Sequence, residues 1–206
     1  MTDRLALYNK ALLYCSEPPL ASLEDDVVSR HVLDAVWADR AVAKILEEGL
    51  WNCALRSLEL VYDPSVAPPF GQARAFRQPD DLVRVNALCS DARMLRPLLS
   101  YLDEAGYWFA DVDAIFVSFV SDDPNFGGDL SRWPPSLADA AARWIAAQAA
   151  HGFNKAEAQI FRMEAAAERA FSLARNRDAM NQPTRFVPPG RWMSARAGRQ
   201  GRDDGL

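Results

Sequence analysis

The chain has 206 residues, of which 50% are hydrophobic and 25% charged, with a formal net charge of −5. This composition is typical of a folded protein with one core and room for a subdomain, and it excludes a disordered chain. The acidic balance argues against a broad basic surface that grips nucleic acid. Cys15, Cys53 and Cys89 are widely spaced and odd in number, so we expect reduced, buried thiols and neither a disulfide framework nor a zinc site.

The N-terminus carries no targeting or membrane signal. It lacks the basic start and continuous apolar run of a signal peptide, and no apolar stretch reaches the roughly 20 residues that span a bilayer. We therefore expect synthesis in the cytoplasm and no membrane contact.

Two helices are predicted at the front of the chain. Thr2 can cap a first helix that runs to about Glu17, where Pro18-Pro19 ends it. Its apolar stripe consists of Leu5, Tyr8, Leu12 and Cys15.

Ser22-Leu23-Glu24-Asp25 has the spacing of a capping box and predicts a second helix that runs to about Leu50. Gly49 is expected to end this helix in a left-handed cap. The expected apolar face consists of Val28, Val32, Ala35, Val42, Ile45 and Leu46.

The hydrophobic period changes between about Trp51 and Pro134. Runs rich in β-branched and aromatic residues, bounded by turn formers, predict three to five short antiparallel strands. Residues 95–105 are expected to be a short helix or irregular. The strand candidates are Leu58-Glu59-Leu60-Val61-Tyr62, Leu82-Val83-Arg84-Val85, Tyr107-Trp108-Phe109 and Ile115-Phe116-Val117-Ser118-Phe119-Val120.

Two Ala-rich helices are predicted behind the strands. Ser136, with Asp139 three residues on, caps a third helix that ends at Gly152, and Asn154 with Glu157 starts a fourth. The short connection predicts antiparallel neighbours. Their apolar stripes are Leu137, Ala141, Trp144 and Ile145 in one, and Ile160, Met163, Ala167, Ala170, Phe171 and Ala174 in the other.

From about Gln182 the periodicity disappears, and we expect a tail that is disordered alone and ordered on a partner. The predicted fold class is therefore α+β, mainly α: an antiparallel helical bundle, an inserted antiparallel β-rich segment and an extended C-terminal tail. The expected division is a bundle of residues 1–50 and 136–181, a β-rich insertion of residues 51–135 and a tail of residues 182–206.

Catalytic signatures are weak. Carboxylates are paired at Asp25-Asp26, Asp80-Asp81, Asp111/Asp113 and Asp122-Asp123, but each pair falls at an expected cap or turn, where Asp is favoured for its backbone hydrogen bonds. His31 and His151 have no Cys or Asp neighbour at nucleophile or ligand spacing. We find no phosphate-binding glycine loop, nucleophile elbow or helical zinc motif, so we predict no catalytic residue, no metal and no cofactor.

The tryptophans favour burial over ligand stacking. Trp37, Trp51, Trp108 and Trp144 fall in or beside predicted elements, where core or interface burial is the expected role. Trp133, before Pro134-Pro135, is expected to fix the entry to the third helix. Trp192 lies among Arg and Pro residues in the tail, so it either anchors on a partner or folds back onto its own chain.

Landmarks along the whole chain give the one lead to function. Gln78-Pro79-Asp80-Asp81, Phe126-Gly127 and Arg132-Trp133-Pro134-Pro135 accompany the strand runs above. Ala6-Leu7-Tyr8-Asn9, Glu17-Pro18-Pro19-Leu20 and Gly49-Leu50-Trp51-Asn52 precede them. In this order they resemble the head-to-tail adaptors of short-tailed phages, the family also called tail tubular protein A.

The resemblance implies a structural virion protein at the head–tail junction and no enzyme. Members of the family form a homo-oligomeric ring, commonly of twelve subunits, beneath the portal protein. The ring extends the DNA channel toward the tail nozzle protein, and the genomic DNA passes without specific binding. By this resemblance the β-rich segment faces the tail, and the C-terminal tail docks on the portal. Arg185, Phe186, Arg191 and Trp192 are the candidate docking residues.

Two alternatives stay open. A virion-associated cell-wall hydrolase would use carboxylates such as Glu24, Asp80 or Asp123, since a glycosidase needs two carboxyls about 5 to 10 Å apart across a cleft. A DNA-packaging component would bind duplex DNA with a steep dependence on salt.

Overall fold

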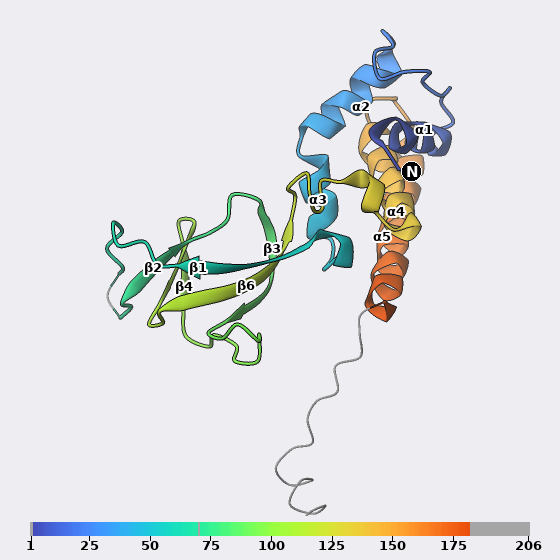
Figure 1. Ribbon diagram of the computed structural model, residues 1–206. Coiled ribbons are helices and arrows are strands. Elements are labelled where there is room, and N and C mark those ends of the chain that lie inside the picture. The colour runs from blue at the N-terminus through green and yellow to red at the C-terminus, as the bar shows by residue number, and fades with distance from the viewer. Residues whose placement is uncertain (1, 70, 182–206) are drawn as a thin grey trace, which may run out of the picture.

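The computed structural model describes residues 2–69 and 71–181. In that part of the chain, 42% of residues are helical and 20% lie in strands, and five helices accompany two small antiparallel three-stranded sheets. The α+β class predicted from the sequence, with more helix than strand, is therefore confirmed. Figure 1 shows the strands in a lobe beside the helices.

The helical part is organised around α4 (Pro135–Ala149), which α1 (Arg4–Cys15), α2 (Val28–Ala38) and α3 (Ala41–Glu47) all contact. The most extensive helix pairing joins α4 to α5 (Glu157–Met180), its antiparallel neighbour. The seven alanines of α4 allow this close approach, and Leu137, Ala141 and Ile145 are fully enclosed as the stripe predicts. Ile160, Ala167, Phe171 and Ala174 form the buried side of α5.

Caps differ from the sequence expectation at three helices. Asp3, not Thr2, caps α1 by accepting a hydrogen bond from the Ala6 N–H. Neither α4 nor α5 has a side-chain cap, because α4 begins at Pro135, whose missing N–H needs no partner, and α5 begins three residues after Asn154. Asn154 instead takes a left-handed φ of 50° in the connection.

The predicted second helix is wrong as a single element. It is divided into α2 and α3 at Asp39-Arg40, where Arg40 has a left-handed φ of 54°. The two pieces therefore do not share one face: Val28 and Ala35 are exposed, and Leu33 is the buried residue of α2. The Ser22/Asp25 pair forms its expected contact, from the Ser22 N–H to Asp25, but in a turn six residues before α2.

Gly49 does not form the predicted left-handed cap. The helix ends at Glu48 in right-handed geometry, and Gly49 is absent from the residues with positive φ. Glycine is needed for space, because a Cβ at this position would lie 2.9 Å from the Trp51 ring. Gly152 likewise lies against Val32, whose Cγ1 would be 2.6 Å from a Cβ there.

The β-rich lobe has six strands where three to five were predicted. One sheet has the order β1 (Leu55–Val61), β6 (Ala114–Ser121), β3 (Leu82–Cys89). The other has the order β2 (Arg74–Arg77), β5 (Tyr107–Ala110), β4 (Leu102–Glu104). Sequence analysis missed β2 and β4 because they are four and three residues long and carry charges at Arg74, Arg77, Asp103 and Glu104, so neither gives an apolar alternation.

Two hydrophobic cores correspond to the two lobes. The β core contains residues of both sheets, among them Phe76, Trp108, Ile115, Val117 and Phe119. The helical core extends into the connections through Trp51, Ala54 and Trp133, and into β6 through Val120. This explains why β6 is apolar on both faces apart from Ser118 and Ser121, because the central strand has one face on the β core while Val120 reaches the helices.

Candidate binding groove

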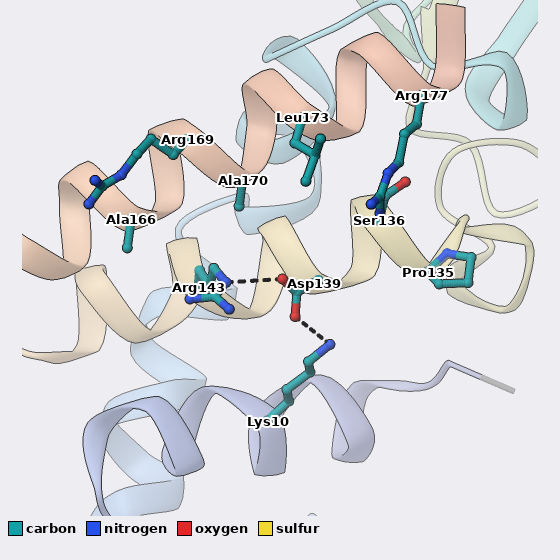
Figure 2. A pocket seen from close by; sticks show the side chains of 10 residues that line it. All are labelled: Lys10, Pro135, Ser136, Asp139, Arg143, Ala166, Arg169, Ala170, Leu173 and Arg177. Atoms are coloured by element: carbon teal, nitrogen blue, oxygen red, sulfur yellow. Dashed lines mark hydrogen bonds and ion pairs between the residues drawn. The ribbon is translucent and has the colours of Figure 1, made fainter. Parts of the chain in front are cut away.

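A surface hollow lies along the seam between α4 and α5. It has a volume of ≈ 620 Å³ and is lined by three helices, with Lys10 from α1, Ser136, Asp139 and Arg143 from α4, and Ala166, Arg169, Ala170, Leu173 and Arg177 from α5 (Figure 2). A smaller hollow of ≈ 160 Å³ shares Arg143 and Ala166 and adds Tyr14, Gln159, Arg162 and Met163. We call the two together the α4–α5 groove.

Helical spacing explains why these residues of α5 meet in one groove. Positions 159, 162, 163, 166, 169, 170, 173 and 177 recur at intervals of three and four, so they form one stripe along the helix. This stripe borders the buried one. Met163 and Ala170 contribute to both the core and the groove, and the arginines form the outer edge.

Asp139 is the electrostatic centre of the groove. Its Oδ1 accepts hydrogen bonds from Tyr14 Oη at 2.6 Å and lies 2.6 Å from Lys10 Nζ, and its Oδ2 lies 3.0 Å from Arg143 Nε. Burial by itself would raise the pKa of this carboxyl, but the hydrogen bonds from Lys10, Tyr14 and Arg143 outweigh it and hold the pKa well below the ordinary value. Asp139 is therefore charged at neutral pH and ties α4 to α1.

Tyr14 and Arg143 complete this cluster. The Arg143 guanidinium lies 4.3 Å from the centroid of the Tyr14 ring. Burial raises the pKa of Tyr14 to about 12, and the hydrogen bond to Asp139 acts in the same direction. The phenol therefore stays protonated as a donor.

The groove carries an excess of positive charge. Five basic residues line it, Lys10, Arg143, Arg162, Arg169 and Arg177, against the one carboxylate of Asp139, which leaves a formal excess of four. Arg169 donates only to the backbone oxygen of Ala165, and no described residue forms an ion pair with Arg162 or Arg177. The groove therefore has the chemistry to bind an anionic group beside an apolar floor.

The paired carboxylates predicted to be structural form local contacts. Asp25 accepts from the N–H groups of Ala21 and Ser22, and Asp111 accepts from the Ala73 N–H. Asp122 Oδ2 lies 3.5 Å from Arg40 Nη2, and Asp113 forms an ion pair with Arg74.

Asp81 is the most enclosed of these carboxylates. It binds Arg56 Nη1 at 2.8 Å and accepts from the buried hydroxyl of Ser121, so it fastens the ends of β1, β3 and β6. Burial would raise its pKa, but the hydrogen bonds from Ser121 and Arg56 lower it.

The three carboxylates of the hydrolase alternative do not gather in one cleft. Glu24 lies in the connection between α1 and α2, while Asp80 and Asp123 lie beside the ends of β3 and β6. None of them lines the α4–α5 groove or the ≈ 350 Å³ pocket between Trp51, Arg84, Arg175 and Asp178. Among the described residues, no group of three or more His, Cys, Asp or Glu side chains could hold a metal ion.

The histidines and the five tryptophans among the described residues lie where the sequence predicts. His31 is exposed on α2, with Nε2 3.0 Å from Asp26, and His151 follows α4. Trp51 and Trp108 are buried, and Trp37 and Trp144 pack against the helical core. Trp133 fixes the entry to α4 by donating from Nε1 to the Gly127 oxygen at 2.8 Å.

Among the described residues, no disulfide joins the three cysteines. Cys15 and Cys89 are buried and Cys53 is partly buried. Burial raises the pKa of Cys15 and of Cys53 to about 11, which keeps both thiols protonated at neutral pH.

The candidate docking residues Arg185, Phe186, Arg191 and Trp192 lie outside the described residues. Sequence analysis in turn missed the α4–α5 groove, since its residues come from three helices that are distant in sequence. The available signal was Arg162 and Arg169, seven residues apart on the polar side of the fourth predicted helix.

No protein-family model matches the chain, and a search of curated proteins finds no significant match. Among the described residues, no helix is both long and apolar enough to cross a membrane.

Proposed function

We propose that this chain is a structural virion protein, a head-to-tail adaptor whose copies form a ring between portal and tail nozzle and extend the DNA channel. In this proposal the bundle comprises residues 1–50 and 136–181, with its main helices antiparallel. The insertion, residues 51–135, faces the nozzle. The tail, residues 182–206, docks on the portal through Arg185, Phe186, Arg191 and Trp192. No catalytic residue, metal or cofactor has a role.

The observation that carries the proposal is the exposed side of α5. This helix is 24 residues long, and large apolar side chains are 62%, 50% and 84% exposed at Phe161, Leu173 and Met180. Large exposed apolar surface bordered by polar residues is typical of protein interfaces. A ring subunit needs such a surface along the side that meets its neighbour.

The β-rich lobe offers a second surface. It lies to the side of the helices in Figure 1, so it extends the molecule in one direction. The segment between β3 and β4 exposes Leu95 and Leu99, the latter to 92%. An exposed apolar loop on this lobe supports a contact with another protein, which in this proposal is the tail nozzle.

The DNA-packaging alternative is supported by one observation, the positive excess of the α4–α5 groove. It predicts submicromolar duplex binding that weakens steeply with salt, because phosphate contacts release counterions. The adaptor proposal predicts little affinity for free duplex, in keeping with the net charge of −5. Fluorescence anisotropy with a labelled duplex at two salt concentrations separates the two.

Co-sedimentation with the portal protein encoded near this gene tests the proposal. Purified portal rings should carry this chain into the pellet at a fixed stoichiometry. A matched variant that lacks residues 182–206 should stay in the supernatant. Wild-type protein that never sediments with portal rings, even in large excess, would contradict the adaptor function.

A further inference from the structure

We propose that the α4–α5 groove receives the acidic loop formed by residues 23–28 of a second copy of this chain. The inference rests on the proposed ring function and names the two surfaces that would join neighbouring subunits. Loop and groove are different surfaces, so each subunit would give its loop to one neighbour and receive a loop from the other. Such head-to-tail contacts close into a ring when the rotation between subunits allows it.

Charge complementarity identifies the loop. Residues 23–28 contain Glu24, Asp25 and Asp26 and no basic residue, against a formal excess of four positive charges in the groove. The Glu24 carboxylate forms no ion pair with the described residues, and Asp26 contacts only the exposed His31. In the groove, likewise, none of the described carboxylates forms an ion pair with Arg162 or Arg177.

The loop and the groove also present apolar side chains to each other. The loop exposes Leu23, Val27 and Val28, the last to 73%. The groove floor presents Ala166, Ala170 and the half-exposed Leu173. A contact with an apolar centre and a charged rim has the usual organisation of a protein interface, in which charge sets specificity and register.

The loop is ordered before it binds. Asp25 Oδ2 accepts hydrogen bonds from the backbone N–H groups of Ala21 and Ser22, and the Ser22 hydroxyl accepts from the Glu24 N–H. Arg30 Nε donates to the Asp25 carbonyl at 2.5 Å. These contacts fix the backbone while leaving Glu24 and Asp26 exposed, which lowers the entropy lost on docking.

The groove suits a peptide better than a nucleic-acid backbone. A phosphate at its centre would lie beside the Asp139 carboxylate, which is held in its charged form. Its floor consists of Ala166, Ala170 and Leu173 of α5, which can pack against side chains and give a phosphate no donor. Nucleic acid is therefore one of the outcomes that the test must separate.

A charge exchange tests the contact in solution, without portal. One variant removes the positive excess of the groove (Arg169→Glu with Arg177→Glu), and the other reverses the charge of the loop (Glu24→Arg with Asp26→Arg). Sedimentation velocity over a concentration series should show self-association of the wild type that weakens with salt, and association at least about tenfold weaker for each variant alone. An equimolar mixture should associate again, because the unchanged acidic loop of the groove variant meets the unchanged basic groove of the loop variant, and the new arginines can face the new glutamates.

Two controls accompany the exchange. Arg93→Glu with Arg96→Glu makes the same change in net charge on the β-rich lobe and should self-associate as the wild type does. Glu24→Gln with Asp26→Asn removes two of the three loop charges without placing a cation near the start of α2, and it should weaken association to an intermediate degree. Circular dichroism checks that each variant is folded.

Four outcomes would overturn the contact: a wild type that is monomeric at every concentration, variants that associate normally, a mixture that stays dissociated, or a groove variant that loses only duplex DNA binding. Because portal takes no part, these results are independent of the adaptor test. A failed exchange with intact portal binding contradicts only the contact between loop and groove. A successful exchange without portal binding contradicts only the adaptor function.

Discussion

Asp139 holds together the part of the groove that α1 and α4 form. Three donors from two helices, Lys10 and Tyr14 of α1 and Arg143 of α4, converge on its two oxygens. A carboxylate that is only partly buried gains less from such contacts than an enclosed one, because water screens the charges. The cluster therefore orders the groove more than it stabilises the fold.

Replacing Asp139 with Asn should lower the free energy of unfolding by about 1–2 kcal/mol, since the amide cannot replace the charge that Lys10 and Arg143 face. Urea unfolding at neutral pH measures the loss. Asp26→Asn, which changes a carboxylate exposed on its loop, serves as the matched control and should leave stability unchanged. Equal effects of the two substitutions would contradict the role assigned to Asp139.

The Asp139 contribution should depend on pH in one direction. Its pKa is lower in the folded protein than the ordinary value of about 3.9 that applies to the unfolded chain. The stabilisation is therefore fully present above that value and is lost as pH falls toward the folded pKa. The difference in unfolding free energy between wild type and Asp139→Asn should shrink below about pH 4. A difference that grows with acidification would contradict this assignment.

Ala105 is a residue whose backbone does not suit its side chain. Ala105 and Gly106 have φ values of 50° and 81° and join β4 to β5, where Glu104 pairs with Tyr107. Two left-handed residues in a two-residue loop define a type I′ turn, which favours Asn-Gly. Ala105→Asn should raise the free energy of unfolding by about 0.5–1 kcal/mol. Thermal unfolding measures this increase. The control is Ala21→Asn, at an exposed position without a left-handed φ, which should leave the free energy of unfolding unchanged.

The pairing of α4 with α5 depends on small side chains. Ala141 is fully enclosed in the helical core, so a leucine there must displace its neighbours. Ala141→Leu should destabilise the protein by about 1–3 kcal/mol through overpacking. Thermal unfolding measures the loss. The control is Ala158→Leu, which places the same side chain on the exposed side of α5 and should leave the stability unchanged. A tolerated leucine at 141 would mean that the helices are not packed as closely as described.

Element by element, the sequence predicts the helices better than the strands. Stripes such as Leu137, Ala141 and Ile145 are strongly periodic, so the rear helices and their antiparallel pairing are predicted correctly. The break at Arg40 is missed because an arginine gives no local signal for a left-handed φ. Strands β2 and β4 are missed because their pairing to β5, not their composition, makes them strands.

The groove could be predicted only in part. The arginine spacing on α5 is visible in the sequence, but the contribution of Lys10 depends on how α1 crosses α4. Such crossings are set by tertiary packing and leave no local pattern. Gly49 is a similar case. A glycine is required there because the Trp51 ring leaves no space for a side chain, and not because a helix ends there.

At the scale of the whole molecule, a few contacts join the two lobes. The buried Asp178 near the end of α5 accepts from the Asn52 N–H at 3.0 Å, and Asn52 Nδ2 donates to the Asp178 backbone oxygen at 2.9 Å. Burial raises the pKa of this carboxyl. Arg84 of β3 also donates to the Glu47 oxygen at the end of α3. These contacts set the β-rich lobe against the helices.

The measurement that tests the adaptor function most directly is electron microscopy of this protein mixed with the portal protein encoded near it. The account predicts a new collar of density on the tail-side face of the portal, which disappears when residues 182–206 are deleted. A portal that stays unchanged at high excess of the full chain would contradict it.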